Sequence, residues 1–288
     1  MRIKSERGNT AAPKKKNGST NAHAPGFFFI IRAMPRFAPD FTGNASFPRR
    51  ALNALLDVFF PRRCLVTEKF PDDSGFLFLS EEGRERLRFI GEDCCPVCGA
   101  PRPDVAVAHG ECVFCRDREF RFGRSRSLVI YDEAARRLIH AIKYGAVHAA
   151  IADLAKIAAE NEIFRRHLDG AVLVPVPLFP TRKAERGFNQ SEVFARELCR
   201  AGAGTRTENL LARTRDTGTQ THLGADARRG NVREAFAAAP KSRKLISPKT
   251  RYVLVDDVFT TGSTLSECAR ALKKAGAKFV DAATFAHG

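Results

Sequence analysis

One stretch near the end of the chain decides the fold: Tyr252-Val-Leu-Val-Asp-Asp-Val-Phe-Thr-Thr-Gly-Ser-Thr264. Its apolar first half predicts a buried strand, and its second half is a polar loop that leads into a helix predicted from Leu265 to Ala275. Thr264 and Glu267 match a capping box, which predicts Thr264 as the N-cap of this helix. A strand, a polar loop and a helix in this order are typical of a ligand site beyond the carboxyl end of a parallel strand.

The loop itself suits a phosphate group. Backbone N–H groups at a helix N-terminus attract anions, and Gly262 lets the backbone approach a ligand closely. Asp256 and Asp257 would repel a phosphate, so we expect them to face ribose hydroxyls or a divalent cation. The alternative is an ordinary strand-turn-helix in which Asp and Thr serve turn chemistry. The candidate phosphate-binding residues are Thr260, Thr261, Gly262, Ser263 and Thr264.

Strands and helices alternate through the last part of the chain. Short apolar runs predict the strands, and apolar residues spaced by three and four predict the helices. The predicted strands are 128–131, 171–174, 252–255 and 279–285, and the predicted helices are 135–142, 151–158, 189–201 and 265–275. This alternation predicts an α/β domain over residues 123–288, with a parallel sheet covered by helices on both faces.

Two further segments carry cations and amides. The strand end Val174-Pro-Val-Pro177 leads into a basic loop and a helix start, where positive charge would neutralise a pyrophosphate. The candidates there are Arg182, Lys183, Arg186, Asn189 and Gln190. A long polar stretch, 213–233, is predicted to be a lid, with Arg213, Gln220 and Arg229 as candidates. For both segments the alternative is a solvated basic surface.

Four of the eight cysteines form two close pairs. Cys95-x2-Cys98 and Cys112-x2-Cys115 are separated by thirteen residues, a spacing typical of a structural zinc site with ligands Cys95, Cys98, Cys112 and Cys115. The alternative is a set of free or redox-active thiols. Residues 46–122 are therefore predicted to hold a short N-terminal helix, with its apolar stripe at 52–59, and a double zinc-ribbon-like module.

Charge is concentrated at the beginning of the chain. The net charge is +16, of which residues 1–33 contribute +6, and the remaining +10 still suits phosphate-rich ligands. The tail, residues 1–45, is predicted to be disordered. It is either a basic arm that contacts nucleic acid or the result of a start codon assigned too early, with Met34 as the alternative start. No run is apolar enough for a membrane span or a secretion signal, so we expect a cytoplasmic protein.

These motifs resemble known families. The stretch 252–264 resembles the phosphoribosyl pyrophosphate (PRPP) signature of type I phosphoribosyltransferases, and the chain from about 47 to 286 resembles the ComF family, which includes the GntX-like proteins. The matching pieces are Phe60-Pro-Arg-Arg-Cys64, Cys95-Pro-Val-Cys-Gly99, Leu138-Ile-His-Ala-Ile-Lys-Tyr144, Arg186-Gly-Phe-Asn-Gln190 and the stretch 252–264. One departure is Cys64-Leu-Val-Thr67, where family members often carry a cysteine pair; Cys64 and Cys94 are its thiol remnants, which puts a second metal site in doubt.

The resemblance implies roles for particular residues. Asp256 and Asp257 would hold the ribose 2′ and 3′ hydroxyls, and the loop 260–264 would wrap the 5′-phosphate of PRPP bound with magnesium. Arg213 to Arg233 would correspond to a flexible catalytic loop. Lys143 would lie near the PRPP site. Without the resemblance, the sequence around it fits an exposed lysine at the end of a helix, where the helix dipole favours a positive charge.

Two functions of different class follow from the resemblance. In the first, the protein is a phosphoribosyltransferase linked to DNA uptake and competence, in which pyrophosphate leaves and a nucleophile attacks the ribose C1 carbon. In the second, it is a non-catalytic accessory of DNA transport that binds single-stranded DNA and a competence helicase-like partner. The chain has no Trp and three Tyr, which offers no aromatic ladder for base stacking. The sequence identifies neither the acceptor nor a catalytic residue.

Overall fold

The computed structural model describes residues 61–70, 72–102, 112–116, 118–144, 147–216 and 234–288. The chain divides into two units, Met1–Pro35 and Arg36–Gly288, and every described residue belongs to the second. The predictions for the tail, for Met34 and for the helix at 52–59 lie outside the described residues, as do Gln220 and Arg229. Within the described ranges, no helix combines the length and the apolar character needed to span a bilayer.

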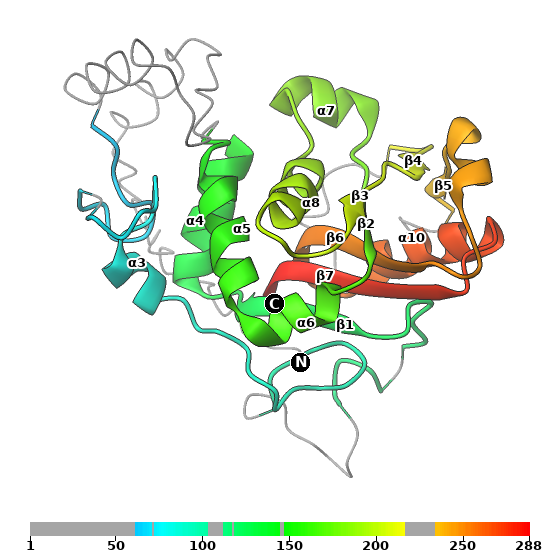
Figure 1. Ribbon diagram of the computed structural model, residues 1–288, viewed down its shortest axis with the longest axis horizontal. Coiled ribbons are helices and arrows are strands. Elements are labelled where there is room, and N and C mark those ends of the chain that lie inside the picture. Colours follow the sequence, from blue (N-terminus) through cyan, green and yellow to red (C-terminus); the bar gives the residue numbers. More distant parts are fainter. Residues whose placement is uncertain (1–60, 71, 103–111, 117, 145–146, 217–233) are drawn as a thin grey trace, which may run out of the picture. The chain divides into compact units, whose positions relative to one another are not determined.

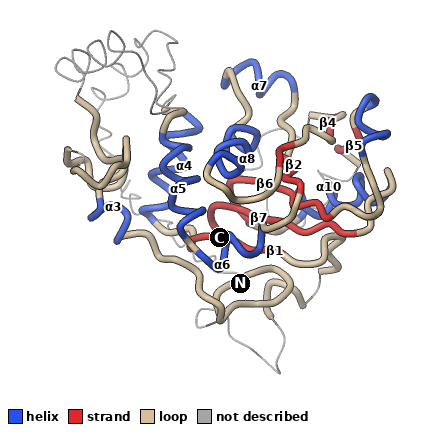
Figure 2. Tube along the Cα trace, in the orientation of Figure 1, coloured by secondary structure: helices blue, strands red, loops and turns tan. Residues whose placement is uncertain are grey.

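A five-stranded parallel sheet organises the second unit (Figures 1 and 2). Its strand order is β1-β7-β6-β2-β3, and every pairing is parallel. The strands are β1 Ser125–Ile130, β2 Val172–Pro175, β3 Arg206–Thr207, β6 Arg251–Phe259 and β7 Phe279–His287. The predicted α/β fold with a parallel sheet is therefore confirmed.

The central strand β6 is longer than its apolar run predicts. It continues from the buried run Tyr252–Val255 through Asp256 and Asp257 to Phe259, and Asp256 pairs with Thr284 of β7. Asp256 and Asp257 therefore belong to the carboxyl-terminal part of the strand itself and not to the loop that follows it.

Alternate residues of β6 enter two separate cores. Val253 and Val255 pack with one set of helices, whereas Tyr252 and Leu254 pack on the other face. The first set is α4 Glu133–Tyr144, α5 Ala150–Glu160, α6 Glu162–Leu168 and α8 Gln190–Arg200. The other face carries α10 Ser263–Lys274, the antiparallel pair β4 Leu211–Arg213 and β5 Phe236–Ala238, and the 3₁₀ helix η2 Pro240–Leu245. Helices cover both faces, as predicted.

The residues before β1 share these two cores. Phe76 and Leu79, which precede the short helix α3 Glu81–Glu85, pack in the core of α4 and α5. Cys98 and Phe122 pack instead in the core of α10. The boundary predicted near residue 122 stays a prediction, because the apolar core continues across it.

Several helices, among them α6 and α7, have no counterpart in the sequence prediction. The N-cap of α6 is Asn161, whose side chain accepts the N–H of Phe164 at 2.9 Å. The helix α7, Pro180–Arg186, has proline in its first turn and ends at Gly187 with a φ of 81°. Because α7 buries no residue, it has no apolar stripe that would reveal it in the sequence. The predicted basic loop is therefore a helix.

The predicted capping box is wrong. The helix α10 begins at Ser263. Its N-cap is Gly262, which has a φ of 71° and, as a glycine, no side chain that could cap the helix. Thr264 already lies inside the helix, and the Glu267 carboxylate accepts the N–H of Glu234 at 2.8 Å instead of reaching back. The sequence pattern fails here because the Glu267 side chain binds the backbone of Glu234, just before β5, and not the N-terminus of its own helix.

Candidate functional site

Asp256 and Asp257 stand at the carboxyl end of the central strand. The Asp256 carboxylate accepts hydrogen bonds from Ser191 Oγ at 2.9 Å and from the N–H of Asp257 at 3.0 Å. Burial and the neighbouring charge of Asp257 raise the pKa of Asp256 to about 7. A carboxyl group poised near neutrality in a cleft is a mark of functional sites. Ser191 was not among the predicted residues; its only signal in the sequence is its place after Asn189 and Gln190.

Lys143 pairs with the second carboxylate. Its Nζ lies 2.6 Å from Asp257 Oδ2, and both side chains are largely shielded from solvent. Burial alone would lower the pKa of Lys143, but the charge and hydrogen bond of Asp257, together with Asp256, raise it above its ordinary value. The ammonium is therefore held charged beside the two carboxylates. The structure thus places Lys143 beside Asp257 and not in solvent at a helix end; its part in a PRPP site stays a prediction.

The segment between α7 and α8 adds polar groups beside this pair. The Arg186 guanidinium donates to Gln190 Oε1 at 3.3 Å and lies over the ring of Tyr144 at 5.6 Å. The Asn189 side chain is engaged locally, donating to the carbonyl of Val176 at 3.0 Å and accepting the N–H of Ser191. Asn189 thus fixes the start of α8, whereas Arg186 faces the site.

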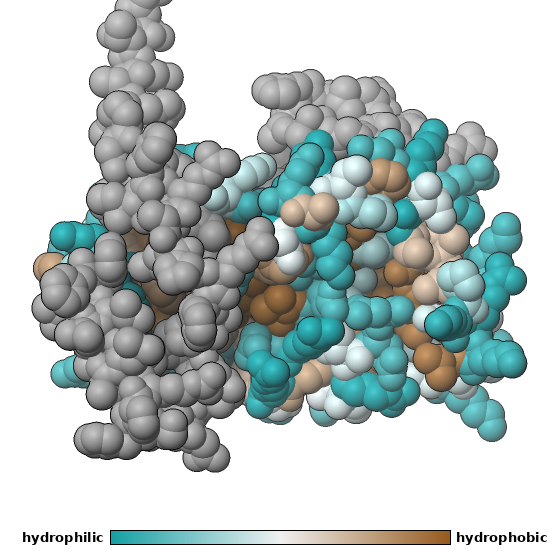
Figure 3. Space-filling view, turned by 90° about the horizontal axis from the view of Figure 1, so that it is seen from above, coloured by the Kyte–Doolittle hydropathy of each residue, from teal (hydrophilic) through white to brown (hydrophobic). Residues whose placement is uncertain are grey.

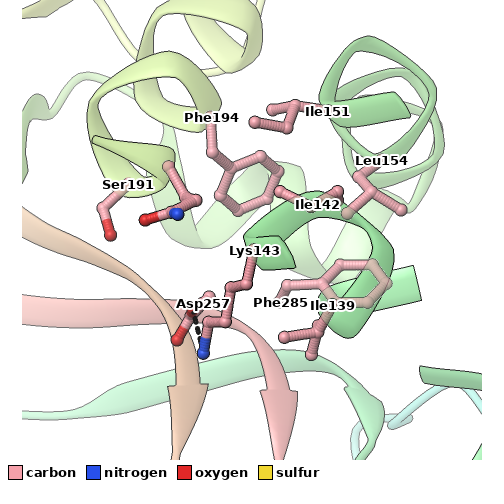
Figure 4. A pocket seen from close by; sticks show the side chains of 10 residues that line it. Ile139, Ile142, Lys143, Ile151, Leu154, Ser191, Phe194, Asp257 and Phe285 are labelled. Carbon is pink, nitrogen blue, oxygen red and sulfur yellow. Dashed lines mark ion pairs between the residues drawn. The ribbon is translucent and has the colours of Figure 1, made fainter. Parts of the chain in front are cut away.

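A small pocket lies between these groups and the first core (Figure 4). Lys143 reaches from α4 to Asp257, Ser191 approaches from α8, and apolar side chains including Phe194 close the far side. The cavity is about 20 Å³, room for about one water molecule. Gln190 also lines it, and its Nε2 is buried with no hydrogen-bond partner among the described residues. A donor of this kind is available to a ligand oxygen.

The threonine-rich loop joins β6 to α10. Thr261 Oγ1 and Ser263 Oγ lie 2.9 Å apart, and the N–H of Ser263 approaches Thr261 Oγ1 at 3.4 Å. No side chain caps the start of α10, so the described structure keeps the first turn of this helix available to an anion. Thr260 is exposed, and Gly262 is buried.

The other predicted cations, Arg182, Lys183 and Arg213, have different partners from Lys143. Lys183 is exposed and pairs with Glu192 at 3.5 Å, and Arg182 lies 3.9 Å from Glu185. On β4, burial lowers the pKa of Arg213 and the charges of Asp216 and Asp256 oppose that shift. Arg213 is therefore within electrostatic reach of the site, but Lys183 is engaged with α8.

The raised pKa of Asp256 has a consequence for stability. The pKa of about 7 lies above the ordinary value of 3.8, which means that ionising Asp256 costs more free energy in the folded protein than in the unfolded chain. The stability of the fold is therefore highest below pH 3.8, where Asp256 is protonated in both states, and it falls as the pH rises through 7. Asp256→Asn should therefore be more stable than the wild type, and its advantage should increase by on the order of 2 kcal/mol between pH 5 and pH 8. Denaturant unfolding at both pH values measures it. A gain equal at both would mean that Asp256 ionises normally.

The four paired cysteines form one cluster. The Sγ atoms of Cys95, Cys98, Cys112 and Cys115 lie within 4.8 Å of one another, with separations of 3.7 Å for Cys95–Cys115 and 3.6 Å for Cys98–Cys112. Sulfurs bound to one zinc ion at about 2.3 Å would lie about 3.8 Å apart in a tetrahedron. Burial, with the charges of neighbouring cysteines, raises the pKa of Cys98 and Cys115. A divalent cation would remove that cost, so the cluster fits a structural zinc ion.

The turn at Cys64 repeats the shape of the turn at Cys95. In each turn the cysteine N–H donates to the carbonyl five residues on, at 2.8 Å, and its carbonyl accepts the N–H four residues on, at 2.8 and 2.9 Å. The residue four positions on has a positive φ in both, 63° for Glu68 and 78° for Gly99.

The chemistry around Cys64 differs from that of the cluster. Thr67 and Ser80 are the polar neighbours of its thiol, and a Cβ added at Gly83 would lie 2.6 Å from Cys64 Sγ. A single thiol with two hydroxyls does not fit a zinc site. Of the described residues, only the four-cysteine cluster groups three or more metal-ligating side chains.

Part of the chain matches a known protein family. A family model described as "Phosphoribosyl transferase domain" matches residues 173–288, the part that contains β2, β6, α10 and β7. A solved structure of the allosteric regulatory enzyme of purine biosynthesis matches 47% of this chain and 25% of its own at 23% identity, with a TM-score of 0.30. The domain match and the parallel sheet together define a protein of the phosphoribosyltransferase fold class.

Relatives narrow this class. The "DNA utilization protein YhgH" of Salmonella typhimurium is 32% identical over 190 residues, which cover 65% of this chain and 80% of the relative. "Competence protein F" of Haemophilus influenzae is 30% identical, over 63% of this chain and 80% of its own. "Competence protein ComFC" of Bacillus subtilis is 27% identical over 67% of this chain and 77% of its own. The chain belongs to the ComF family.

Proposed function

We propose that this protein binds PRPP with magnesium at the carboxyl end of β6 and is a phosphoribosyltransferase linked to DNA uptake. One observation carries the proposal: two adjacent carboxylates, one of them paired with Lys143 at 2.6 Å, precede a helix N-terminus that has no side-chain cap. Carboxylates suit the hydroxyls of a ribose, and a helix N-terminus suits its phosphate. Both ends of a ribose 5-phosphate thus have a matching group.

Each part of the site would have its own role. Asp256 and Asp257 would accept hydrogen bonds from the 2′ and 3′ hydroxyls, while Thr260 to Thr264 would bind the 5′-phosphate with backbone N–H groups and hydroxyls. Magnesium, an oxygen-binding cation, would neutralise the pyrophosphate when bound with PRPP. Its protein ligands would come from the same two carboxylates, the hard oxygen donors at this end of the sheet.

The pyrophosphate would be stabilised by cations as it leaves. Lys143 and Arg186 flank the carboxylates, and Gln190 Nε2, which has no partner among the described residues, can donate to an oxygen. Positioning and charge neutralisation suffice for such a reaction, since the nucleophile comes from the acceptor. Arg213 and the segment that follows it, with Gln220 and Arg229, would cover the site, and Arg182 and Lys183 would add positive charge at its rim.

The alternative is a binding protein that reuses the fold. The names of the relatives refer to competence and DNA utilization, and the net charge of +16 would attract a polyanion. On the face seen in Figure 3, the coloured residues are mostly hydrophilic, with hydrophobic residues in scattered patches. Under this alternative the protein would bind single-stranded DNA beside a helicase-like partner. In either case the unpaired cysteines suit the reducing cytoplasm.

Calorimetric titration of the purified protein distinguishes the two functions. PRPP with magnesium is one titrant, and a single-stranded oligonucleotide is the other, at two salt concentrations. Saturable PRPP binding supports the proposed function. Absence of PRPP binding together with salt-sensitive oligonucleotide binding would replace it with the alternative.

A further inference from the structure

The segment 118–123 follows the four-cysteine cluster and contacts the loop 260–264 between β6 and α10. Below, the cluster with this segment is called the cysteine module, and the loop 260–264 is called the phosphate loop. The Arg118 guanidinium lies 3.5 Å from the carbonyl oxygen of Thr261, and the N–H of Arg121 donates to Ser266 Oγ on α10 at 3.0 Å. Two residues farther on, the N–H of Gly123 donates to the carbonyl of Val280 at 2.8 Å. The segment 118–123 is therefore fastened at both ends against the α10 face of the sheet.

The ring of Phe120 lies directly against the loop glycine. A Cβ added at Gly262 would come within 2.6 Å of Phe120 Cε1 and 2.7 Å of Phe259 Cζ, closer than any side chain tolerates. Gly262 also has a φ of 71°, the left-handed conformation that glycine adopts most readily. This backbone conformation sets where α10 begins, and the two rings occupy the space beside it.

Aromatic contacts connect this ring to the thiol cluster. Phe120 stacks on Phe122 at 4.8 Å and meets Phe259 edge to face at 6.0 Å. Phe259 stacks on His287 at 4.8 Å, and His287 meets Phe114 at 5.3 Å. Phe114 lies between Cys112 and Cys115 in the sequence. A continuous series of rings thus runs from the second cysteine pair to the phosphate loop.

We propose that Phe120 and Arg118 are positioning residues of the phosphate loop, so that the cysteine module forms part of the PRPP site. This inference rests on the proposed function. Phe120 holds Gly262 in its left-handed conformation, which keeps the N–H groups of the first turn of α10 aimed at one point. Arg118 adds a positive charge beside Thr261. A loop that is ordered before the ligand arrives binds it more tightly, since less entropy is lost on binding.

The metal would act through the same residues. With a zinc ion bound, the four cysteines fix the turn 112–115, and the chain leaving Cys115 reaches Phe120 after only five residues. Loss of the ion would free that turn and, with it, the support behind the loop. PRPP affinity should therefore depend on the metal, although none of the four ligands touches the proposed ligand site.

The test compares Phe120→Ala with Phe279→Ala. Both substitutions remove one ring, but Phe279 is exposed at the start of β7, opposite Arg251 and hence at the other end of the strand from Asp256. We expect Phe120→Ala to raise the dissociation constant for PRPP with magnesium about tenfold, with one metal equivalent retained, and Phe279→Ala to leave it unchanged. Phe120→Leu should restore part of the affinity, and Arg118→Gln should weaken binding to a smaller degree.

A second measurement needs no PRPP. Amide hydrogen exchange of residues 260–265 should be faster in Phe120→Ala, and in chelator-treated wild type, than in Phe279→Ala. Wild-type protein that binds no PRPP would overturn the proposed function, and the exchange result would still decide whether Phe120 holds the loop. Unchanged exchange in Phe120→Ala, with the metal present and the sheet intact, would overturn this inference.

Discussion

The double variant Asp256→Asn/Asp257→Asn is expected to lose measurable PRPP binding while it keeps its fold and its metal. At pH 8, above the pKa of about 7 of Asp256, each substitution replaces a charged acceptor with a neutral amide. Hydrogen bonds to charged groups contribute about 1.5–3 kcal/mol each, so two of them correspond to a loss on the order of 100-fold or more in affinity. Removing both charges also leaves Lys143 without the partner that holds it at 2.6 Å.

Calorimetric titration with PRPP and magnesium measures the effect, and circular dichroism with metal analysis checks the fold. The matched control is Asp72→Asn/Asp73→Asn, which changes the net charge by the same amount at two exposed, adjacent residues before α3. If the control also lost binding, net charge rather than the ribose contact would be responsible. Wild-type affinity in the Asp256/Asp257 variant would contradict the ribose assignment.

The second large effect is expected at the cysteine cluster. Wild-type protein should contain one equivalent of zinc, and Cys95→Ser/Cys112→Ser should contain none, since one ligand of each pair is lost. Zinc binding to structural sites contributes about 10–16 kcal/mol in isolated fingers, so the variant should also unfold at a clearly lower temperature.

Elemental analysis and thermal unfolding measure both results. Cys199→Ser is the control, because Cys199 lies on α8, half-buried and outside the cluster. One equivalent of metal retained by the double variant would mean that the ion is held elsewhere. Two equivalents in the wild type would mean that the turn at Cys64 also binds a metal, against the inference from Thr67 and Ser80.

The sequence predicts the sheet better than the site. The strands β2 and β6 are continuous apolar runs, and the stripes of α4, α5 and α8 repeat at helical spacing, so local pattern suffices for them. The helix α7 escapes because it buries nothing, and the capping box at Thr264 fails because Glu267 binds a distant backbone group.

The site depends on contacts that local pattern does not encode. The bond from Ser191 to Asp256 joins residues 65 apart, and the contact from Arg118 to Thr261 joins residues 143 apart. Lys143 could be placed beside the carboxylates only through the resemblance to a family. The candidate loop residues could be named from the sequence because Thr, Gly and Ser follow one another between β6 and α10.

The two cysteine turns, alike in shape, rest on different supports. The one at Cys95 would be stabilised by the proposed zinc ion, whereas the one at Cys64 is buried in the core of α4 and α5, where Arg137 bonds Glu68 at 3.0 Å. In a cell short of zinc, the two regions that contain these turns would differ in stability. The region behind the phosphate loop would loosen, and the region against the helices would stay folded. Under the two proposals, a shortage of zinc would weaken PRPP binding before the core of α4 and α5 unfolds.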